Sequence, residues 1–133
     1  MEAVAFTRTY NETLEMIVEA RNYMAFVESR ERQRRDVATN LRHCCEALRV
    51  TSRLTEAMAW LMMQRAVQQG EVTMQEALGE RHRLSGQSIC LEDAANHDET
   101  LPIGLRSLLD RSLRLYQRVG RLEQMVMSRA MMN

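Results

Sequence analysis

Apolar residues in the first half of the chain recur three and four positions apart, the spacing of one face of an α-helix. These positions are Tyr10, Leu14, Ile17, Met24 and Val27, then Leu41, Cys44 and Leu48, with a second stripe of Ala47, Val50, Leu54, Ala57 and Leu61. No glycine or proline occurs before Gly70, so nothing interrupts a helix locally. The pattern predicts helices over 7–34 and 37–69, with the boundary near Arg35.

The second half of the chain is more interrupted. Gly70 suits a left-handed helix stop, and Thr73 with Glu76 has the spacing of a capping box that opens a short helix over 73–83. Residues 84–100 contain four acids and no basic residue, which predicts a mobile acidic loop. Pro102 fits the first turn of a last helix over 101–130. Its apolar seam alternates strictly by three and four: Leu105, Leu108, Ser112, Leu115, Val119, Leu122 and Val126.

These elements predict an all-α fold, an antiparallel three-helix bundle with long helices joined by short connections. A minor short helix and the acidic loop precede the last helix. At 133 residues the chain fits one helical-bundle domain over 1–133. The longest apolar run, 57–63, is far shorter than the roughly 20 residues that span a bilayer, so we expect a soluble protein with no membrane partner.

Composition narrows the possible functions. The 18 basic and 18 acidic residues cancel, so there is no global attraction to nucleic acid. All basic residues are arginine, which excludes chemistry based on a lysine Schiff base or a phosphate-loop lysine. Three cysteines make no disulfide framework, and no secretory signal is visible at the N-terminus, so we expect a cytoplasmic protein.

No catalytic, cofactor-binding or metal-binding constellation is recognisable, and we expect a protein that is not an enzyme and has no cofactor. His43, Cys44 and Cys45 are consecutive on a predicted helix and point about 100° apart, so they cannot all bind one ion. Cys90 and His97 share the acidic loop with nearby aspartates. They leave a metal-dependent small enzyme as the weakest hypothesis.

The run 57–63, centred on Trp60, is apolar around the whole helix, whereas a bundle helix normally buries only a stripe. Two interpretations stay open: enclosure by the neighbouring helices, or contact with another surface. Tryptophan, methionine and arginine are enriched in interface cores. We therefore expect Trp60, Met63 and Arg65 to mediate self-association into a homodimer.

Charge is unevenly distributed. Residues 100–133 contain six arginines and two acids, whereas residues 71–99 contain two arginines and seven acids. Weaker candidates for partner contacts are Arg111, Arg114 and Arg118 in the last helix and Glu92 and Asp93 in the acidic loop. The alternatives are a general protein-interaction regulator or a helical protein that binds nucleic acid through the last helix and the arginines of 30–35. Nucleic acid is disfavoured because acids interleave with those arginines and no aromatic residue accompanies them.

Two stretches resemble the RcdA family, regulators of CtrA degradation in alphaproteobacteria. They are EALRVTSRLTEAMAWLMMQRAVQQGEVTMQEALGERHRL (46–84) and LPIGLRSLLDRSLRLYQRVGRLE (101–123), about half of the chain. The resemblance implies a dimeric three-helix bundle that acts as a non-enzymatic adaptor for the ClpXP protease. It further implies partners such as a CpdR-type response regulator, the adaptor PopA and a cell-cycle cargo such as CtrA, with the cell pole as a candidate location.

Overall fold

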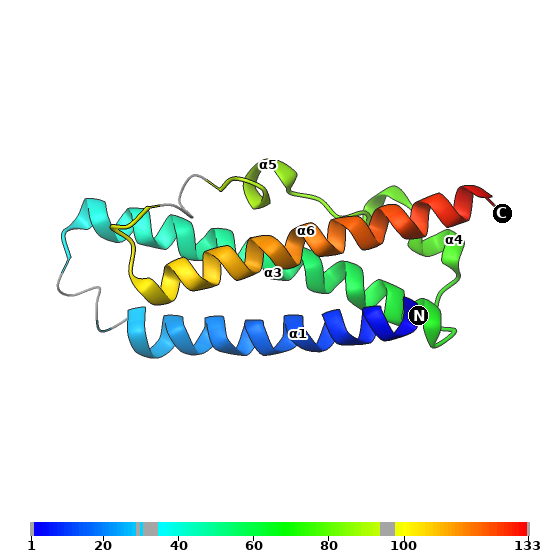
Figure 1. Ribbon diagram of the computed structural model, residues 1–133, viewed down its shortest axis with the longest axis horizontal. Helices are drawn as coiled ribbons and strands as arrows, with labels where there is room; N and C mark the ends of the chain where they lie inside the picture. Colours follow the sequence, from blue (N-terminus) through cyan, green and yellow to red (C-terminus); the bar gives the residue numbers. More distant parts are fainter. Residues whose placement is uncertain (1, 29, 31–34, 94–97, 133) are drawn as a thin grey trace.

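Three long helical segments run along the molecule in the computed structural model, which describes residues 2–28, 30, 35–93 and 98–132 (Figure 1). They are α1 (Glu2–Asn22), continued by the π-helix η1 (Tyr23–Glu28), then α3 (Val37–Gln68) and α6 (Ile103–Met132). Between α3 and α6 in the sequence come α4 (Met74–Ala77), the 3-10 helix η2 (Glu80–His82) and α5 (Gln87–Cys90). The predicted all-α class is confirmed.

Local signals explain several of the observed boundaries. The carboxylate of Asp36 caps α3 by accepting a hydrogen bond from the Thr39 amide at 2.7 Å. Beyond the other end of α3, Gly70 has the left-handed φ of 76° that the sequence predicts. Both hydrogen bonds of the Thr73 and Glu76 capping box are present.

Several boundaries differ from prediction. α1 begins at Glu2 rather than at residue 7, and the predicted end at 34 lies outside the described residues. The short helix expected over 73–83 is split, because Gly79 has an extended backbone, with φ −61° and ψ 153°, between α4 and η2. α6 begins one residue after Pro102, whose carbonyl accepts the first helical hydrogen bond from Arg106.

The helix directions follow from the connections. α1 is antiparallel to α3 and to α6, but α3 and α6 run parallel, because the chain between them returns along the bundle (Figure 1). The expected short connection between antiparallel neighbours therefore applies to α1 and α3 only. Two core clusters result, one around Trp60, Leu61 and Val119 and one around Val50, Leu54 and Leu109.

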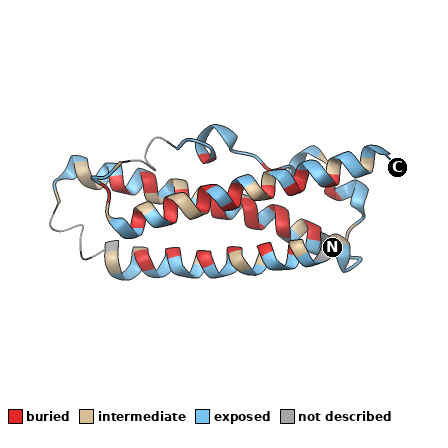
Figure 2. Ribbon diagram, in the orientation of Figure 1, coloured by how far each residue is buried: buried red, intermediate tan, exposed pale blue. Residues whose placement is uncertain are grey.

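The predicted seam of α6 is confirmed at every position. All seven residues from Leu105 to Val126 named above are buried, and together with the buried stripe of α3 they form the interior (Figure 2). Among the described residues, no helix has the length and apolar character needed to cross a membrane.

Candidate functional site

Residues 84–93, which we call the strap, lie across α3 and α6 and are tied to both helices through their backbone. Arg53 of α3 holds one end. Its side chain is fully buried, and it donates from Nε to the Cys90 carbonyl at 2.7 Å and from Nη2 to the Glu92 carbonyl at 2.6 Å. Its remaining nitrogen, Nη1, donates to the Leu109 carbonyl of α6 at 2.7 Å.

Oriented carbonyl groups therefore surround the Arg53 charge. Burial lowers the pKa of this guanidinium, yet an arginine side chain stays charged at neutral pH. Charge-assisted hydrogen bonds are stronger than neutral ones, and here they join the strap, α3 and α6 at one point.

The side chains of Glu123, Glu56 and Tyr116 hold the beginning of the strap through hydrogen bonds. A carboxylate oxygen of Glu123 accepts from the Leu84 amide at 2.6 Å, and one of Glu56 accepts from the Ser85 hydroxyl at 2.8 Å. The Tyr116 hydroxyl donates to the Ser85 carbonyl at 2.6 Å. Burial raises the pKa of Tyr116, which keeps the hydroxyl protonated as a donor.

The prediction of a mobile acidic loop over 84–100 is therefore wrong for residues 84–93, because buried side chains of α3 and α6 fix the backbone of this segment. Glu92 and Asp93, predicted as partner contacts, are exposed at the end of this fixed segment. His97 lies outside the described residues, while Asp98 forms an ion pair with Arg42 of α3. A role of Glu92 and Asp93 in partner contacts stays a prediction.

Two ion pairs join α1 and α6 at the surface between these helices. Arg111 binds Glu19 with two hydrogen bonds, at 2.7 and 2.5 Å, and Arg118 binds Glu12 at 2.5 Å. The hydrogen bonds between Glu19 and Arg111 lower the pKa of the Glu19 carboxyl and raise the pKa of Arg111. Two of the three arginines predicted to contact partners are thus paired with glutamates of α1.

Arg114 differs from these two arginines. Its side chain is 72% exposed and forms an ion pair with Asp110 one turn away on α6. Together with Asp93 and the exposed Ile103, Arg114 lines an open groove of about 680 Å³. The structure therefore brings Asp93 and Arg114 to one groove, while Arg111, Arg114 and Arg118 line a second one of about 270 Å³ between α1 and α6.

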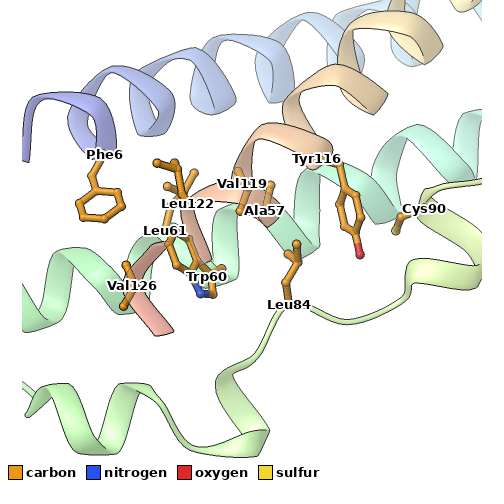
Figure 3. Packing of buried hydrophobic residues seen from close by; sticks show 10 residues of the cluster. All are labelled: Phe6, Ala57, Trp60, Leu61, Leu84, Cys90, Tyr116, Val119, Leu122 and Val126. Carbon is orange, nitrogen blue, oxygen red and sulfur yellow. The ribbon is translucent and has the colours of Figure 1, made fainter. Parts of the chain in front are cut away.

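Trp60 lies inside the bundle, which removes the reason for placing it in an interface. It is 4% exposed and makes an edge-to-face contact with Phe6 of α1 at 5.9 Å between ring centroids. Figure 3 shows it among side chains from α1, α3, α6 and the strap. α1 begins early enough to bring Phe6 over Trp60, so the bundle itself covers that side of the apolar run.

Met63 and Arg65 do not join Trp60 in one patch. Met63 is half-buried, while the Arg65 guanidinium lies 4.9 Å from the centre of the Tyr10 ring of α1. Arg65 thus contacts its own chain. The homodimer remains a prediction, but these three residues do not form a common surface for it.

Comparison with known proteins identifies the family. The chain matches over residues 1–133 the family described as "Protein of unknown function (DUF1465)". It is also similar to the crystal structure of RcdA from Caulobacter crescentus CB15, with 31% sequence identity and a TM-score of 0.73 over 91% of this chain and 89% of that chain. The chain belongs to the RcdA family. No curated protein sequence matches it.

Within this RcdA-family fold, the residues considered for chemistry are dispersed. Cys44 and Cys45 are exposed, whereas His43 is buried beside them on α3 and Cys90 is a buried residue of the strap itself. Across the part of the chain that the structure describes, no three histidine, cysteine, aspartate or glutamate residues are grouped so that they could hold a metal ion.

The arginine cluster of 30–35 is described only in part. Residues 31–34 lie outside the described residues, and Arg30 donates from Nε to the Phe26 carbonyl at 2.9 Å. The nucleic-acid alternative therefore has less support, since Arg111 and Arg118 are also paired with glutamates of α1.

One side of α3 in this RcdA-family bundle has no charged residue, and sequence analysis missed it. α3 contains six charged residues: Arg42, Glu46, Arg49, Arg53, Glu56 and Arg65. Arg49, Arg53 and Glu56 contact the strap, and Glu46 pairs with Arg49. Arg42 pairs with Asp98, and Arg65 contacts Tyr10 of α1. The opposite side contains Leu41, Cys44, Leu48, Thr51, Thr55, Ala59 and Met62, all exposed. The three- and four-residue spacing of these exposed residues was the available signal. Only the structure distinguishes this exposed stripe from the buried stripe beside it.

Proposed function

We propose that this protein is a non-enzymatic adaptor that acts as a homodimer and tethers cargo for regulated proteolysis by a ClpXP-type protease. The similarity to RcdA along nearly the full length of both chains supports this proposal most strongly. By the same resemblance, its partners would include a CpdR-type response regulator and a cell-cycle cargo such as CtrA, in the cytoplasm or at the cell pole.

The geometry is compatible with tethering. The three long helices present fixed surfaces, and Arg53 fixes the backbone of the strap at Cys90 and at Glu92, next to Asp93. A rigid protein that binds two partners raises their effective concentration without changing a chemical step. No group on the protein needs to react.

Reconstituted degradation tests the proposal. We expect the protein to lower the KM of ClpXP for a CtrA-type cargo while leaving kcat unchanged, because tethering improves encounter and not cleavage. At large excess, the protein should slow degradation again, because cargo and protease then occupy separate adaptor molecules.

A KM that does not change over the full range of protein concentration would contradict the adaptor role. A matched control is the same assay with a ClpXP substrate that does not depend on adaptors, whose KM should stay constant.

A further inference from the structure

An open pocket lies where the first turns of α1 meet the last turns of α3, and we call it the end pocket (Figure 1). Residues of both helices line it, and its volume is about 290 Å³. The strap does not contribute to it, and neither do the residues predicted to contact partners on α6. The end pocket is therefore separate from the sites described above.

Part of the wall of the end pocket is apolar. Phe6 and Leu61 line it, are 9% and 2% exposed, and belong to the core cluster around Trp60 (Figure 3). Tyr10 also lines the pocket and packs against the same cluster. An apolar group that entered the pocket would leave water by packing against these side chains, which is favourable.

Arg65 is the charged residue among those that line the end pocket, and two contacts position its guanidinium. The guanidinium lies 4.9 Å from the centre of the Tyr10 ring. In the orientation of the Gln69 amide that satisfies both of its polar atoms, the oxygen accepts from Nε of Arg65 at 3.3 Å and the nitrogen donates to Glu71 at 3.1 Å. Neither Nη atom of Arg65 has a hydrogen bond to another residue in the part of the chain that the structure describes.

Arg65 also differs from other arginines of the bundle in its electrostatic surroundings. Each of five others forms an ion pair with a carboxylate: Arg42, Arg49, Arg111, Arg114 and Arg118. Among the described residues, no carboxylate forms such a pair with Arg65. The end pocket therefore combines an oriented cation that lacks a counterion with an apolar wall.

We infer that the end pocket binds a small monocarboxylate with an apolar body. The planar guanidinium matches a carboxylate, which can accept from both Nη atoms of Arg65 at once. The apolar body would then pack against Phe6 and Leu61, and the side-chain amides of Asn11 and Gln68, which also line the pocket, can donate further hydrogen bonds.

The charge and the size of the end pocket both favour this class of ligand. Phosphorylated groups are normally recognised by clusters of arginine, whereas the end pocket contains a single one. Its volume of about 290 Å³ lies at the lower end of the range for small-molecule sites, which favours a small acid over a ligand of nucleotide size.

A titration with 3-phenylpropionate tests the inference, with two-dimensional NMR of the side-chain amides of Asn11, Gln68 and Gln69 as the readout. We expect saturable shifts with a dissociation constant of about 1 mM or lower. The neutral analogue 3-phenylpropanamide should bind at least about tenfold more weakly because it lacks the charge. Acetate should also bind at least about tenfold more weakly, because it lacks the apolar body.

Substitutions of Arg65 separate this site from other anion contacts. Arg65→Met should weaken the binding of 3-phenylpropionate at least about tenfold and leave the binding of the amide unchanged. Arg65→Lys keeps the charge but loses the planar fork, so it should have an intermediate effect. Arg121→Met is the matched control, because Arg121 is an exposed arginine of α6 that does not line the pocket, and it should bind as the unmodified protein does.

Circular dichroism checks that the variants fold, which we expect because Arg65 and Arg121 are both exposed. The absence of saturable shifts up to about 10 mM ligand, ten times the expected dissociation constant, would overturn the inference. So would equal affinities for 3-phenylpropionate and either acetate or the amide, or an Arg65→Met variant that binds as tightly as the unmodified protein. Because binding is measured directly, these outcomes do not depend on the adaptor role.

Discussion

The ring of Tyr23 lies directly against the backbone of Gly104. A Cβ atom at Gly104 would be only 2.7 Å from Cε2 of Tyr23, closer than side chains pack. Tyr23 opens the π-helix η1 and is buried, and Gly104 is in the first turn of α6. The absence of a side chain at 104 therefore sets how closely the end of α1 approaches the start of α6.

Gly104→Ala should destabilise the protein by about 1–3 kcal/mol, because the new methyl group forces the Tyr23 ring to move within a packed core. Chemical denaturation of the variant and of the unmodified protein measures the difference in the free energy of unfolding.

Gly120→Ala is the matched control on the same helix. Its Cβ would lie 3.9 Å from Leu84, an ordinary contact, so alanine should stabilise α6 by about 0.5–1 kcal/mol through helix propensity. Equal effects of the two substitutions would show that Tyr23 does not restrict position 104.

Arg53→Met should release the strap and lower the free energy of unfolding by about 2–4 kcal/mol, because the carbonyls of Cys90, Glu92 and Leu109 lose their common donor. Hydrogen exchange of the backbone amides in 84–93 should become faster.

Cys90 reports on the same opening. In a Cys44→Ser, Cys45→Ser background, its thiol should react slowly with a disulfide reagent, since it is buried and burial raises its pKa. Arg53→Met should accelerate this reaction, whereas Arg49→Met, which removes one hydrogen bond to the Ile89 carbonyl, should have a smaller effect. Unchanged Cys90 reactivity in Arg53→Met would mean that Arg53 does not hold the strap.

The ion pair of Glu19 and Arg111 should make a small contribution to stability that depends on pH. The hydrogen bonds from Arg111 lower the pKa of Glu19 below its ordinary value of 4.5, so the folded state binds this proton less readily than the unfolded state. The contribution is therefore complete above the unfolded pKa and is lost as the pH falls through the folded pKa.

Glu19→Gln measures this contribution. The variant should be less stable than the unmodified protein at pH 7 by no more than about 1 kcal/mol, since the pair is partly exposed. The difference should shrink below about pH 4 and in high salt. A difference that is constant from pH 7 to pH 3 would contradict an electrostatic origin.

Trp60→Phe should leave the oligomeric state unchanged, because Trp60 packs on Phe6 inside the chain. Trp60→Ala should cost about 3–5 kcal/mol of stability through the cavity it creates. In the unmodified protein, emission from this tryptophan should resist quenching by iodide. If a folded Trp60→Phe variant were monomeric while the unmodified protein was a dimer, this result would show that Trp60 contributes to the dimer interface.

Sequence patterns determined the helices and much of the core. The seam from Leu105 to Val126 was readable because a helix buries one stripe at fixed spacing, and Asp36, Gly70 and Thr73 act through local hydrogen bonds and backbone angles. Local interactions of this kind involve residues only a few positions apart, so their order along the chain contains the information.

Tertiary structure alone decided which side of each helix is covered. Arg53 became the centre of the strap contacts only because residues 37, 39 and 56 positions further along the chain return to it. Trp60 is buried because Phe6 packs against it, and the stripe of Leu41, Leu48 and Met62 is exposed because no helix in the described part of the chain packs against it. Both stripes have helical spacing, and burial depends on what packs against a residue from elsewhere in the chain, which spacing does not encode.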